Sequence, residues 1–330
     1  MILPPELFTI KQPAPADLEL FENKQFNDVV LYSVESGFHS VKVVENEVGR
    51  FLNFNNTYQA GFINHEFYHG NLPYINYFLL PCLINPEIKK ILLIGLGTGK
   101  VLHDFIKLLP DLEKIDVVDI DPTVIELART YFGFEENEKI NIHLQDGRVF
   151  ARTAKEKYDL IITDIAGDEG IPYRFVTREF LLEIQNILND RGILISNLFG
   201  SAETESSENI ILKAFNGTFK SVFKNVGLFK CDYSDKIFYK TFFDMDYRIL
   251  DTANMLFLGS NGMGFEGLAE VSKKQIENFE RIGIKNLNLY VQDFYRNEIN
   301  SEGCKVLLDG YEYDSDFYLE NFNNYVKNVK

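Results

Sequence analysis

Glycines and carboxylates recur in this chain at the ends of short apolar runs. Residues 91–94 are Ile-Leu-Leu-Ile, and three alternating glycines follow them, Gly95, Gly97 and Gly99. The next strand-like run along the chain ends at Asp119. Glycines let a backbone turn sharply and approach a ligand closely, and a carboxylate at the end of the next strand can hold both hydroxyls of a ribose. The pattern predicts a nucleotide-binding α/β domain.

The spacing of the glycines also distinguishes between nucleotides. A dinucleotide fingerprint is G-x-G-x-x-G, and its third glycine would fall at Lys100. The chain has G-x-G-x-G instead, with Thr98 before the last glycine, which is the usual loop for S-adenosylmethionine and its relatives. Because the loop lies between a buried strand and a helix-like stretch at 101–109, we favour adenosyl-sulfonium binding over a purely structural turn.

Three carboxylates, Asp119, Asp146 and Asp164, stand where strands of the same sheet end. In open parallel sheets, ligands bind at this edge. Asp119, followed by Ile120, would accept hydrogen bonds from the ribose diol, and Asp146, followed by Gly147, would accept one from the adenine amino group. The alternative is that acids at strand ends are solvated or cap the next helix.

The third strand-end acid, Asp164, opens a loop that extends to Pro172 and contains Asp168. A group leaves a sulfonium by in-line displacement, so an attacking amine must be neutral and correctly oriented. A neighbouring carboxylate can orient the amine and receive its proton, which makes Asp164 the candidate catalytic residue. Asp168 would hold a second amine or anchor the loop. The alternative is a loop that only caps the next helix and closes the site.

Aromatic and hydrogen-bonding residues precede the nucleotide domain. Tyr58, Gln59, Tyr68 and His69 are expected to line a pocket shared between domains, although His69 alone also fits a structural role. No metal is predicted, because the five histidines lack the spacing of metal ligands.

The elements that must position these groups alternate regularly. Strands are expected at 91–94, 115–119, 140–144, 159–163, 193–197, 221–230 and 254–259, and helices at 100–109, 122–131, 148–154, 177–189 and 208–219. This alternation predicts an α/β fold with a doubly wound, mainly parallel sheet, of the class I S-adenosylmethionine-binding, Rossmann-like type. A helix at 272–282 and a strand at 287–291 are expected near the C-terminus.

Short β-branched or aromatic runs at 29–34, 38–44 and 51–54 predict a small N-terminal antiparallel sheet. A helix at 65–80, ending before Pro81, would connect it to the larger sheet. The expected domains are an irregular lead-in at 1–25, a β-hairpin domain with its connecting helix at 26–88, a transferase domain at 89–262 and a C-terminal extension of unknown role at 263–330.

The composition limits which binding partners and which cellular compartment are expected. The chain has 330 residues and a net charge of -16, which would repel a phosphate backbone, so no nucleic-acid partner is expected. Its three scattered cysteines indicate neither a disulfide framework nor a zinc site. No apolar stretch is long enough to span a bilayer and no targeting pattern is evident, so a cytoplasmic protein without a membrane partner is expected.

The order of these motifs resembles the polyamine aminopropyltransferases, the spermidine synthase family, over about residues 37–261. The resemblance rests on the hairpin ending in Gln59, Tyr68-His69, the glycine loop, Val118-Asp119-Ile-Asp121, Gln145-Asp146-Gly147, the strand ending at Asp164, and Gly192-Ile-Leu-Ile. It implies that Gln59, Asp119 and Asp146 bind the nucleoside, that Asp164 is the catalytic acid-base residue, and that the chain forms a homodimer or homotetramer.

Several positions depart from the family pattern, most of them in amine recognition. The loop acid that grips the amine of decarboxylated S-adenosylmethionine is replaced by Thr98, the glutamine ending the fifth strand by Asn197, and the glutamate after Tyr68-His69 by Gly70. The gate loop, residues 168–172, also departs from the family pattern. The glycine loop at 95–99 and the stretch 171–179 look more like the divergent spermidine synthase-like branch of the family. A buried ammonium without its carboxylate would cost several kcal/mol.

The sequence therefore predicts a spermidine synthase-like transferase with S-adenosylmethionine or its decarboxylated form as co-substrate. Its main predicted reaction is aminopropyl transfer to a polyamine or related small amine. Methyl transfer to a small molecule is the alternative. A donor that retains its carboxylate would be repelled by an acid at position 98, and the chain has Thr98 there instead. A non-catalytic nucleoside-binding protein is the third hypothesis, and Asp164 speaks against it.

Overall fold

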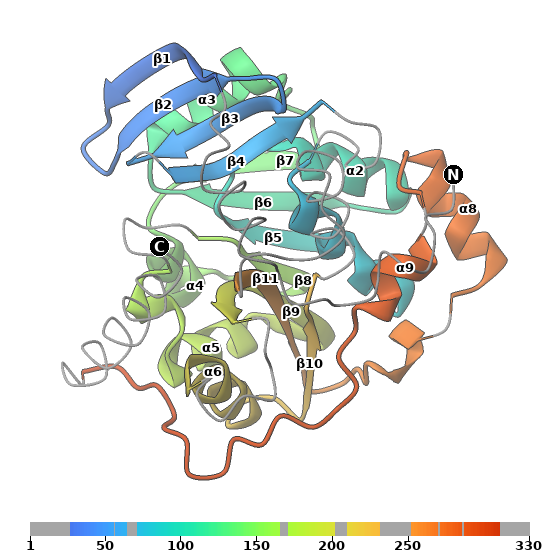
Figure 1. The fold of residues 1–330 in the computed structure, drawn as a ribbon. Coiled ribbons are helices and arrows are strands. Elements are labelled where there is room, and N and C mark those ends of the chain that lie inside the picture. The colour runs from blue at the N-terminus through green and yellow to red at the C-terminus, as the bar shows by residue number, and fades with distance from the viewer. Residues whose placement is uncertain are drawn as a thin grey trace, which may run out of the picture.

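The computed structural model describes residues 27–55, 57–64, 71–165, 171–201, 210–231, 252–269, 271–285 and 287–310. Within this part of the chain, a four-stranded sheet at the N-terminus lies beside a seven-stranded sheet that carries helices on both faces (Figure 1). This arrangement confirms the predicted fold class.

The N-terminal sheet is antiparallel throughout, and its strands follow chain order. It consists of β1 (Val29–Glu35), β2 (Ser40–Glu45), β3 (Gly49–Phe54) and β4 (Thr57–Ile63). Three of these strands were predicted. The fourth, Thr-Tyr-Gln-Ala-Gly-Phe-Ile, was not, because its polar and small residues interrupt the apolar alternation by which a strand is recognised.

The larger sheet has the order β10-β11-β9-β8-β5-β6-β7 among the described residues. Its parallel strands are β5 (Lys90–Ile94), β6 (Lys114–Asp119), β7 (Ile140–Leu144), β8 (Tyr158–Thr163) and β9 (Leu188–Ser201). Strand β11 (Thr252–Ser260) runs antiparallel to both β9 and β10 (Asn225–Phe229). The strand order reverses at β5 and β8, the crevice where open α/β sheets bind ligands.

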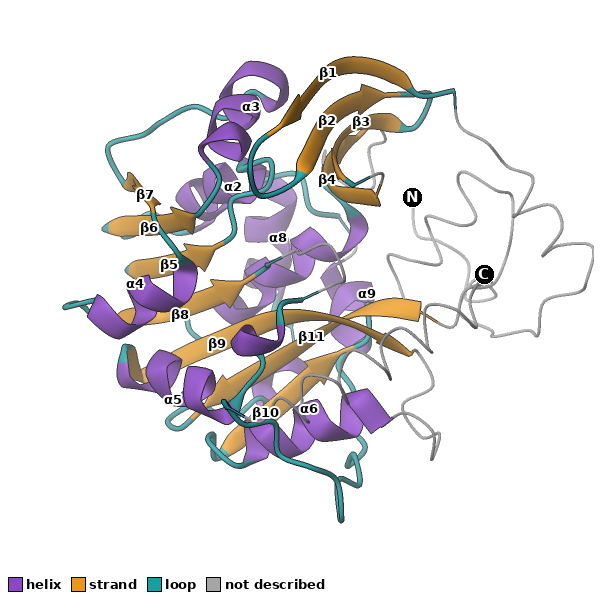
Figure 2. Ribbon diagram, turned by 90° about the vertical axis from the view of Figure 1, so that its left-hand side faces the viewer, coloured by secondary structure: helices purple, strands orange, loops and turns teal. Residues whose placement is uncertain are grey.

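Alternate residues of β5 pack against helices on opposite faces of the sheet. Ile91 and Leu93 belong to the apolar core that contains α2 (Lys100–Leu108) and α3 (Pro122–Phe132). Leu92 and Ile94 point into the core on the opposite face, formed with α4 (Gly147–Thr153), α5 (Arg178–Asn186) and α6 (Ile210–Lys220) (Figure 2). A strand buried on both faces shows the continuous apolar run that the sequence has here.

Two expectations about local structure are wrong. The described part of the connecting segment, η3 (Pro73–Leu83), is a 3-10 helix that continues through Pro81, whereas the expected helix ended before it; residues 65–70 of that helix lie outside the described residues. The Pro81 carbonyl accepts the amides of Ile84 and Asn85, so its missing N–H does not end the helix. Proline has no backbone N–H to donate, but its carbonyl can still accept hydrogen bonds from the residues that follow.

The described part of the C-terminal extension contains two α-helices, one of which lies where a strand was expected. The helix α8 (Lys273–Arg281) was predicted, and Ser272 caps it. Residues 287–291, expected as a strand, lie in the helix α9 (Leu287–Gln292). Both periods fit so short an apolar run. Leu287, Leu289, Tyr290 and Val291 are all buried, so the burial pattern does not distinguish a helix from a strand here.

The N-terminal sheet shares its apolar core with one face of the larger sheet. Val43 and Leu52 of the former belong to the same core cluster as Leu93 and Phe105 of the latter. The domain limits remain a prediction. No helix in the described ranges is long and apolar enough to cross a bilayer.

Candidate functional site

The glycine loop turns at the ends of the two strands that flank the crevice. Gly95 has φ +97°, and a Cβ atom there would lie 2.1 Å from the backbone oxygen of Asp164. Its amide donates to the Val118 carbonyl, and the Asp164 amide donates to the Ile94 carbonyl. Gly97 and Gly99 also have positive φ. The backbone of the predicted loop therefore lies directly against the strand end that carries Asp164.

Asp119 holds the far side of this loop. One of its carboxylate oxygens accepts the Leu96 amide at 2.9 Å, and the other accepts the Asp121 amide at 2.9 Å. Burial raises the pKa of Asp119, and these backbone hydrogen bonds oppose the rise. Each oxygen keeps a lone pair for a ribose hydroxyl. Ile120, beside it, is 40% exposed and offers an apolar surface at the same edge.

Replacing Asp119 by Ala is expected to weaken nucleoside binding at least tenfold. The change removes the acceptor of two hydroxyl donors, and one charged hydrogen bond contributes ~1.5–3 kcal/mol. Calorimetry with S-adenosylmethionine and methylthioadenosine measures the loss, and NAD serves as the comparison ligand. Tight NAD binding by the wild-type chain, or unchanged affinity in the variant, would contradict this assignment.

Asp146 acts as the helix cap that the sequence left open as an alternative. Its Oδ1 accepts the backbone amides of Arg148 and Val149, both at 3.0 Å, and so caps α4, whose first residue is the buried Gly147. Its Oδ2 forms an ion pair with Arg174. The contact with an adenine amino group remains a prediction, and an adenine would have to share Oδ2 with the Arg174 guanidinium.

The carboxylate of Asp164 is held from both sides. The Tyr74 hydroxyl donates to Oδ2 at 3.0 Å, and Asn197 Nδ2 donates to Oδ1 at 2.8 Å. Burial raises the pKa of Asp164, while both hydrogen bonds lower it. Burial and the neighbouring Asp164 charge also raise the pKa of Tyr74, so its hydroxyl remains a donor. Asn197 Oδ1 is buried without a partner in the described part of the chain, which leaves an acceptor beside the carboxylate.

A small cavity lies between the glycine loop, strand β4 and the Asp164 carboxylate. Its lining residues are Ala60, Gly61, Ile75, Phe78, Leu93, Gly95, Leu96, Gly97, Thr98, Gly99, Lys100, Val101 and Asp164. Among them, Asp164 carries the only carboxylate and Lys100 the only ammonium group. Lys100 Nζ lies 3.4 Å from the buried Asp104 carboxylate, and burial lowers the pKa of Lys100.

Of the four predicted pocket residues, the structure describes Tyr58 and Gln59, and the two differ in their contacts. Gln59 is half-buried on β4 and precedes Ala60, a residue of the cavity lining. The hydroxyl of Tyr58 donates instead to Asp28, at the N-terminal edge of the small sheet. Tyr68 and His69 lie outside the described residues, as does Asp168, and their roles remain predictions.

Sequence reasoning missed Tyr74 and Lys100. Tyr74 lies with Tyr77 and Phe78 in an aromatic stretch of the connecting helix, a pattern typical of a packing face. Its hydroxyl was the available signal, since a buried tyrosine hydroxyl needs a partner. Lys100 was noted only as the residue that breaks the dinucleotide fingerprint.

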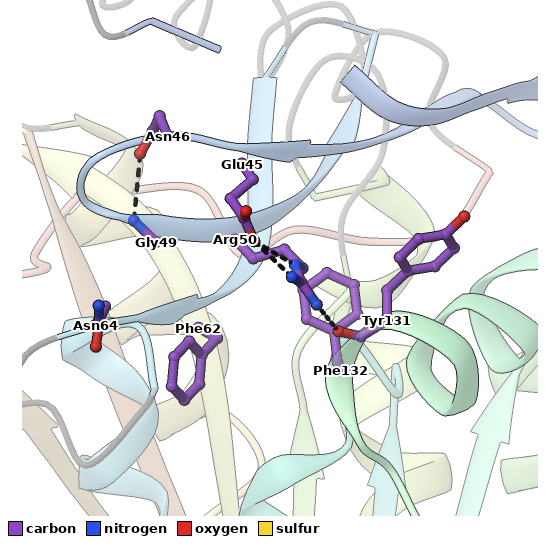
Figure 3. Close-up of a pocket in the computed structure, with 8 residues that line it drawn as sticks. All are labelled: Glu45, Asn46, Gly49, Arg50, Phe62, Asn64, Tyr131 and Phe132. Carbon is purple, nitrogen blue, oxygen red and sulfur yellow. Dashed lines mark hydrogen bonds and ion pairs between the residues drawn. The ribbon is translucent and has the colours of Figure 1, made fainter. Parts of the chain in front are cut away.

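A larger cavity, of about 490 Å³, opens between the turns of the N-terminal sheet and the end of α3 (Figure 3). Arg50 crosses it, with Nε donating to Glu45 at 2.8 Å and Nη1 donating to the Tyr131 carbonyl at 2.8 Å. None of the predicted site residues lines this cavity.

The chain is similar to known proteins in sequence and in fold. Residues 78–232 match the spermine/spermidine synthase domain. The polyamine aminopropyltransferase of Vibrio vulnificus is 35% identical over 150 residues, which are 44% of this chain and 50% of that protein. The chain thus spans about half the length of this curated relative.

Solved structures show the same fold. Spermidine synthase from Thermotoga maritima has a TM-score of 0.61 at 20% identity, covering 83% of this chain and 86% of that one. A probable spermidine synthase from Corynebacterium glutamicum has a TM-score of 0.62 at 16% identity, covering 85% and 97%. Over residues 78–232, just under half of the chain, the sequence is thus similar to the spermine/spermidine synthase domain, and the fold matches that of the spermidine synthase structures.

Proposed function

We propose that this chain is a transferase that moves an aminopropyl group from an adenosyl-sulfonium donor to a small amine. The observation that carries the proposal is the Asp164 carboxylate, held by Tyr74 and Asn197 at the edge of the glycine-loop cavity. Support also comes from relatives named polyamine aminopropyltransferase.

In the proposed reaction, the acceptor nitrogen attacks the carbon next to the sulfonium as the carbon–sulfur bond breaks. The bonding electrons pass to sulfur, which leaves as the neutral thioether of methylthioadenosine, and the proton lost from nitrogen passes to Asp164. Burial raises the pKa of this carboxyl group and makes it a stronger base. Asn197 Oδ1, which has no partner among the described residues, can accept a second hydrogen from the same amine and orient the lone pair of the nitrogen.

The test is release of methylthioadenosine from decarboxylated S-adenosylmethionine in the presence of putrescine, cadaverine or agmatine. Acceptor-dependent release together with an aminopropylated product would support the proposal. Tight donor binding without release for any amine would contradict it and favour the non-catalytic alternative.

The hydrogen bond from Tyr74 to Asp164 leads to a prediction about how turnover depends on pH. The Tyr74→Phe variant is expected to lower turnover about tenfold, because a hydrogen bond to a charged group contributes ~1.5–3 kcal/mol. That bond lowers the pKa of Asp164, so its loss raises the pKa further. The acid limb of the pH–rate profile should therefore move to higher pH, where Asp164 ionises in the variant.

The matched control for this measurement is Tyr77→Phe. Tyr77 lies in the same helix and is buried, but its hydroxyl bonds Asp293 rather than Asp164. We expect the acid limb of the pH–rate profile of Tyr77→Phe to remain at its wild-type position. An unshifted limb in Tyr74→Phe, or an equal shift in Tyr77→Phe, would remove Tyr74 from the proton-transfer site.

A second candidate is transfer from S-adenosylmethionine that retains its carboxylate, as in methyl transfer. The observations that favour it are the absence of an acid at Thr98 and the presence of Lys100 in the cavity lining. An ammonium beside the donor's tail attracts a carboxylate and repels an ammonium. The two candidates therefore differ in the charge of the donor tail, which the loop residues are expected to select.

A further inference from the structure

A short piece of the C-terminal extension lies across the start of α5. We call residues 307–309 the C-terminal strap. Leu307 is 1% exposed, its amide donates to Thr218 Oγ1 at 3.0 Å, and its carbonyl accepts the Arg178 amide at 2.7 Å. The Asp309 amide donates to Glu179 Oε2 at 2.8 Å. The strap is thus fixed to the first residues of α5 through its backbone.

The side chain of Asp309 ties the strap to a buried arginine. Asp309 Oδ1 accepts from Arg148 Nη1 at 2.8 Å and from Thr177 Oγ1 at 2.8 Å. Arg148 is 5% exposed, and its Nε also donates to Glu183 at 2.8 Å. Because a buried guanidinium is strongly destabilising without its carboxylates, Arg148 depends on Asp309 for part of its charge balance.

Arg148 connects the strap to the predicted nucleoside site. It lies two residues after Asp146, and its Nη1 also donates to the Arg174 carbonyl at 2.9 Å. The Arg174 guanidinium in turn pairs with Asp146 Oδ2 and lies over the Phe175 ring, 4.8 Å from its centre. A continuous set of contacts therefore runs from Asp309 to the Asp146 carboxylate, the predicted adenine ligand.

The same strap also holds the segment that follows the gate loop. The Tyr173 hydroxyl donates to the Leu308 carbonyl at 3.0 Å, and Thr177, the N-cap of α5, donates to Asp309. Residues 173–179 thus contact the strap at both their beginning and their end. Fixing such a segment before binding lowers the entropy that a ligand would otherwise have to overcome in ordering it.

We propose that Asp309 is a positioning residue for donor binding. Through Arg148 and Thr177 it fixes residues 173–177, and with them the Arg174–Asp146 pair at the edge of the nucleoside site. This gives part of the C-terminal extension a role in donor affinity. The inference rests on the proposed function only in its use of an adenosyl donor.

The experiment compares nucleoside affinity in wild type, Asp309→Asn and Asp309→Ala, measured by calorimetry with methylthioadenosine and S-adenosylmethionine. We expect affinity to fall about tenfold in both variants. With the acceptor identified, the donor KM should rise by the same factor while kcat at saturating donor stays within about twofold. The matched control is Glu298→Gln, which removes an exposed ion pair with Lys220 elsewhere in the extension and should leave both values unchanged.

Two additional readouts separate positioning from general stability. Arg174→Ala combined with Asp309→Asn should lose little more affinity than either change alone, because both act through one set of contacts. Wild-type affinity in Asp309→Asn, a lower kcat at unchanged KM, or a reduced melting temperature without loss of affinity would overturn the inference. So would a wild-type chain that binds neither nucleoside. Nucleoside binding that depends on Asp309, without aminopropyl transfer, would uphold it while refuting the proposed reaction.

Discussion

The Asp164→Asn variant is expected to lose about 100- to 10,000-fold in turnover while its affinity for the donor nucleoside stays near that of wild type. The asparagine keeps the size of the side chain. Its oxygen can still accept the hydrogen bond from Asn197, and its amide group can donate to the Tyr74 hydroxyl. The asparagine cannot receive the proton released when an amine attacks. The loss should therefore appear in kcat.

The measurement is methylthioadenosine release at saturating donor, with the acceptor first identified by screening diamines, agmatine, and hydroxylated and thiol acceptors. The control variant Asp111→Asn removes a carboxylate from an exposed loop and should turn over like wild type. Asp168→Asn is expected chiefly to raise the acceptor concentration required. Full turnover in Asp164→Asn with any acceptor would leave the structural role of the loop as the better interpretation.

The pH profile gives the same prediction an independent test. Burial places the pKa of Asp164 above the ordinary value for a carboxyl group, so the base is lost at a higher pH than an exposed aspartate would be. Wild-type turnover should fall as the pH drops through that pKa. The residual turnover of Asp164→Asn should lack this acid limb, since the group that titrates is gone.

The sheet could be predicted because its signals are local. Residues 91–94 form an apolar run bounded by Gly95, and each later strand is separated from the next by an amphipathic helix. The strand ends then bring Asp119, Asp146 and Asp164 to one edge without further information. The structure agrees on these positions because the parallel order itself determines them.

The contacts made by these carboxylates could not be predicted in the same way. Tyr74 and Asp164 are 90 residues apart, and Arg148 and Asp309 are 161 apart. Neither separation leaves a periodic pattern, so only the folded chain shows which tyrosine or aspartate is the partner. For Asp146, both a cap and a ligand contact suit a strand-end acid, and the structure shows the cap.

The charge at the glycine loop is expected to decide which donor is preferred, and the second large effect is predicted there. In the wild-type chain, preference for decarboxylated S-adenosylmethionine over the carboxylated form should be weak or reversed. Thr98 offers no charge to the aminopropyl ammonium. Lys100, whose ammonium lies 3.4 Å from the Asp104 carboxylate, is the only lysine among the described residues of the cavity lining and is expected to disfavour a second ammonium there. The carboxylated donor would instead gain attraction to Lys100.

The Thr98→Asp variant should shift the ratio of the two affinities about 100-fold toward the decarboxylated donor. An acid there attracts the ammonium and repels the carboxylate, and at ~1.5 kcal/mol for each effect the two together change the ratio by two orders of magnitude. Lys100→Gln should shift the ratio in the same direction by a smaller factor. Lys107→Gln, an exposed position on the same helix and outside the lining, is the control.

Calorimetry with both donors against the four chains measures these ratios directly, and adding salt tests their electrostatic origin. Because Thr98 is half-buried, its contact with a donor should be screened less than an exposed pair, so the shift should persist at physiological ionic strength. If the wild-type chain already prefers the decarboxylated donor a hundredfold, an acid other than residue 98 supplies the contact and the expectation is wrong. If Thr98→Asp leaves the ratio unchanged, the donor tail does not lie against the glycine loop.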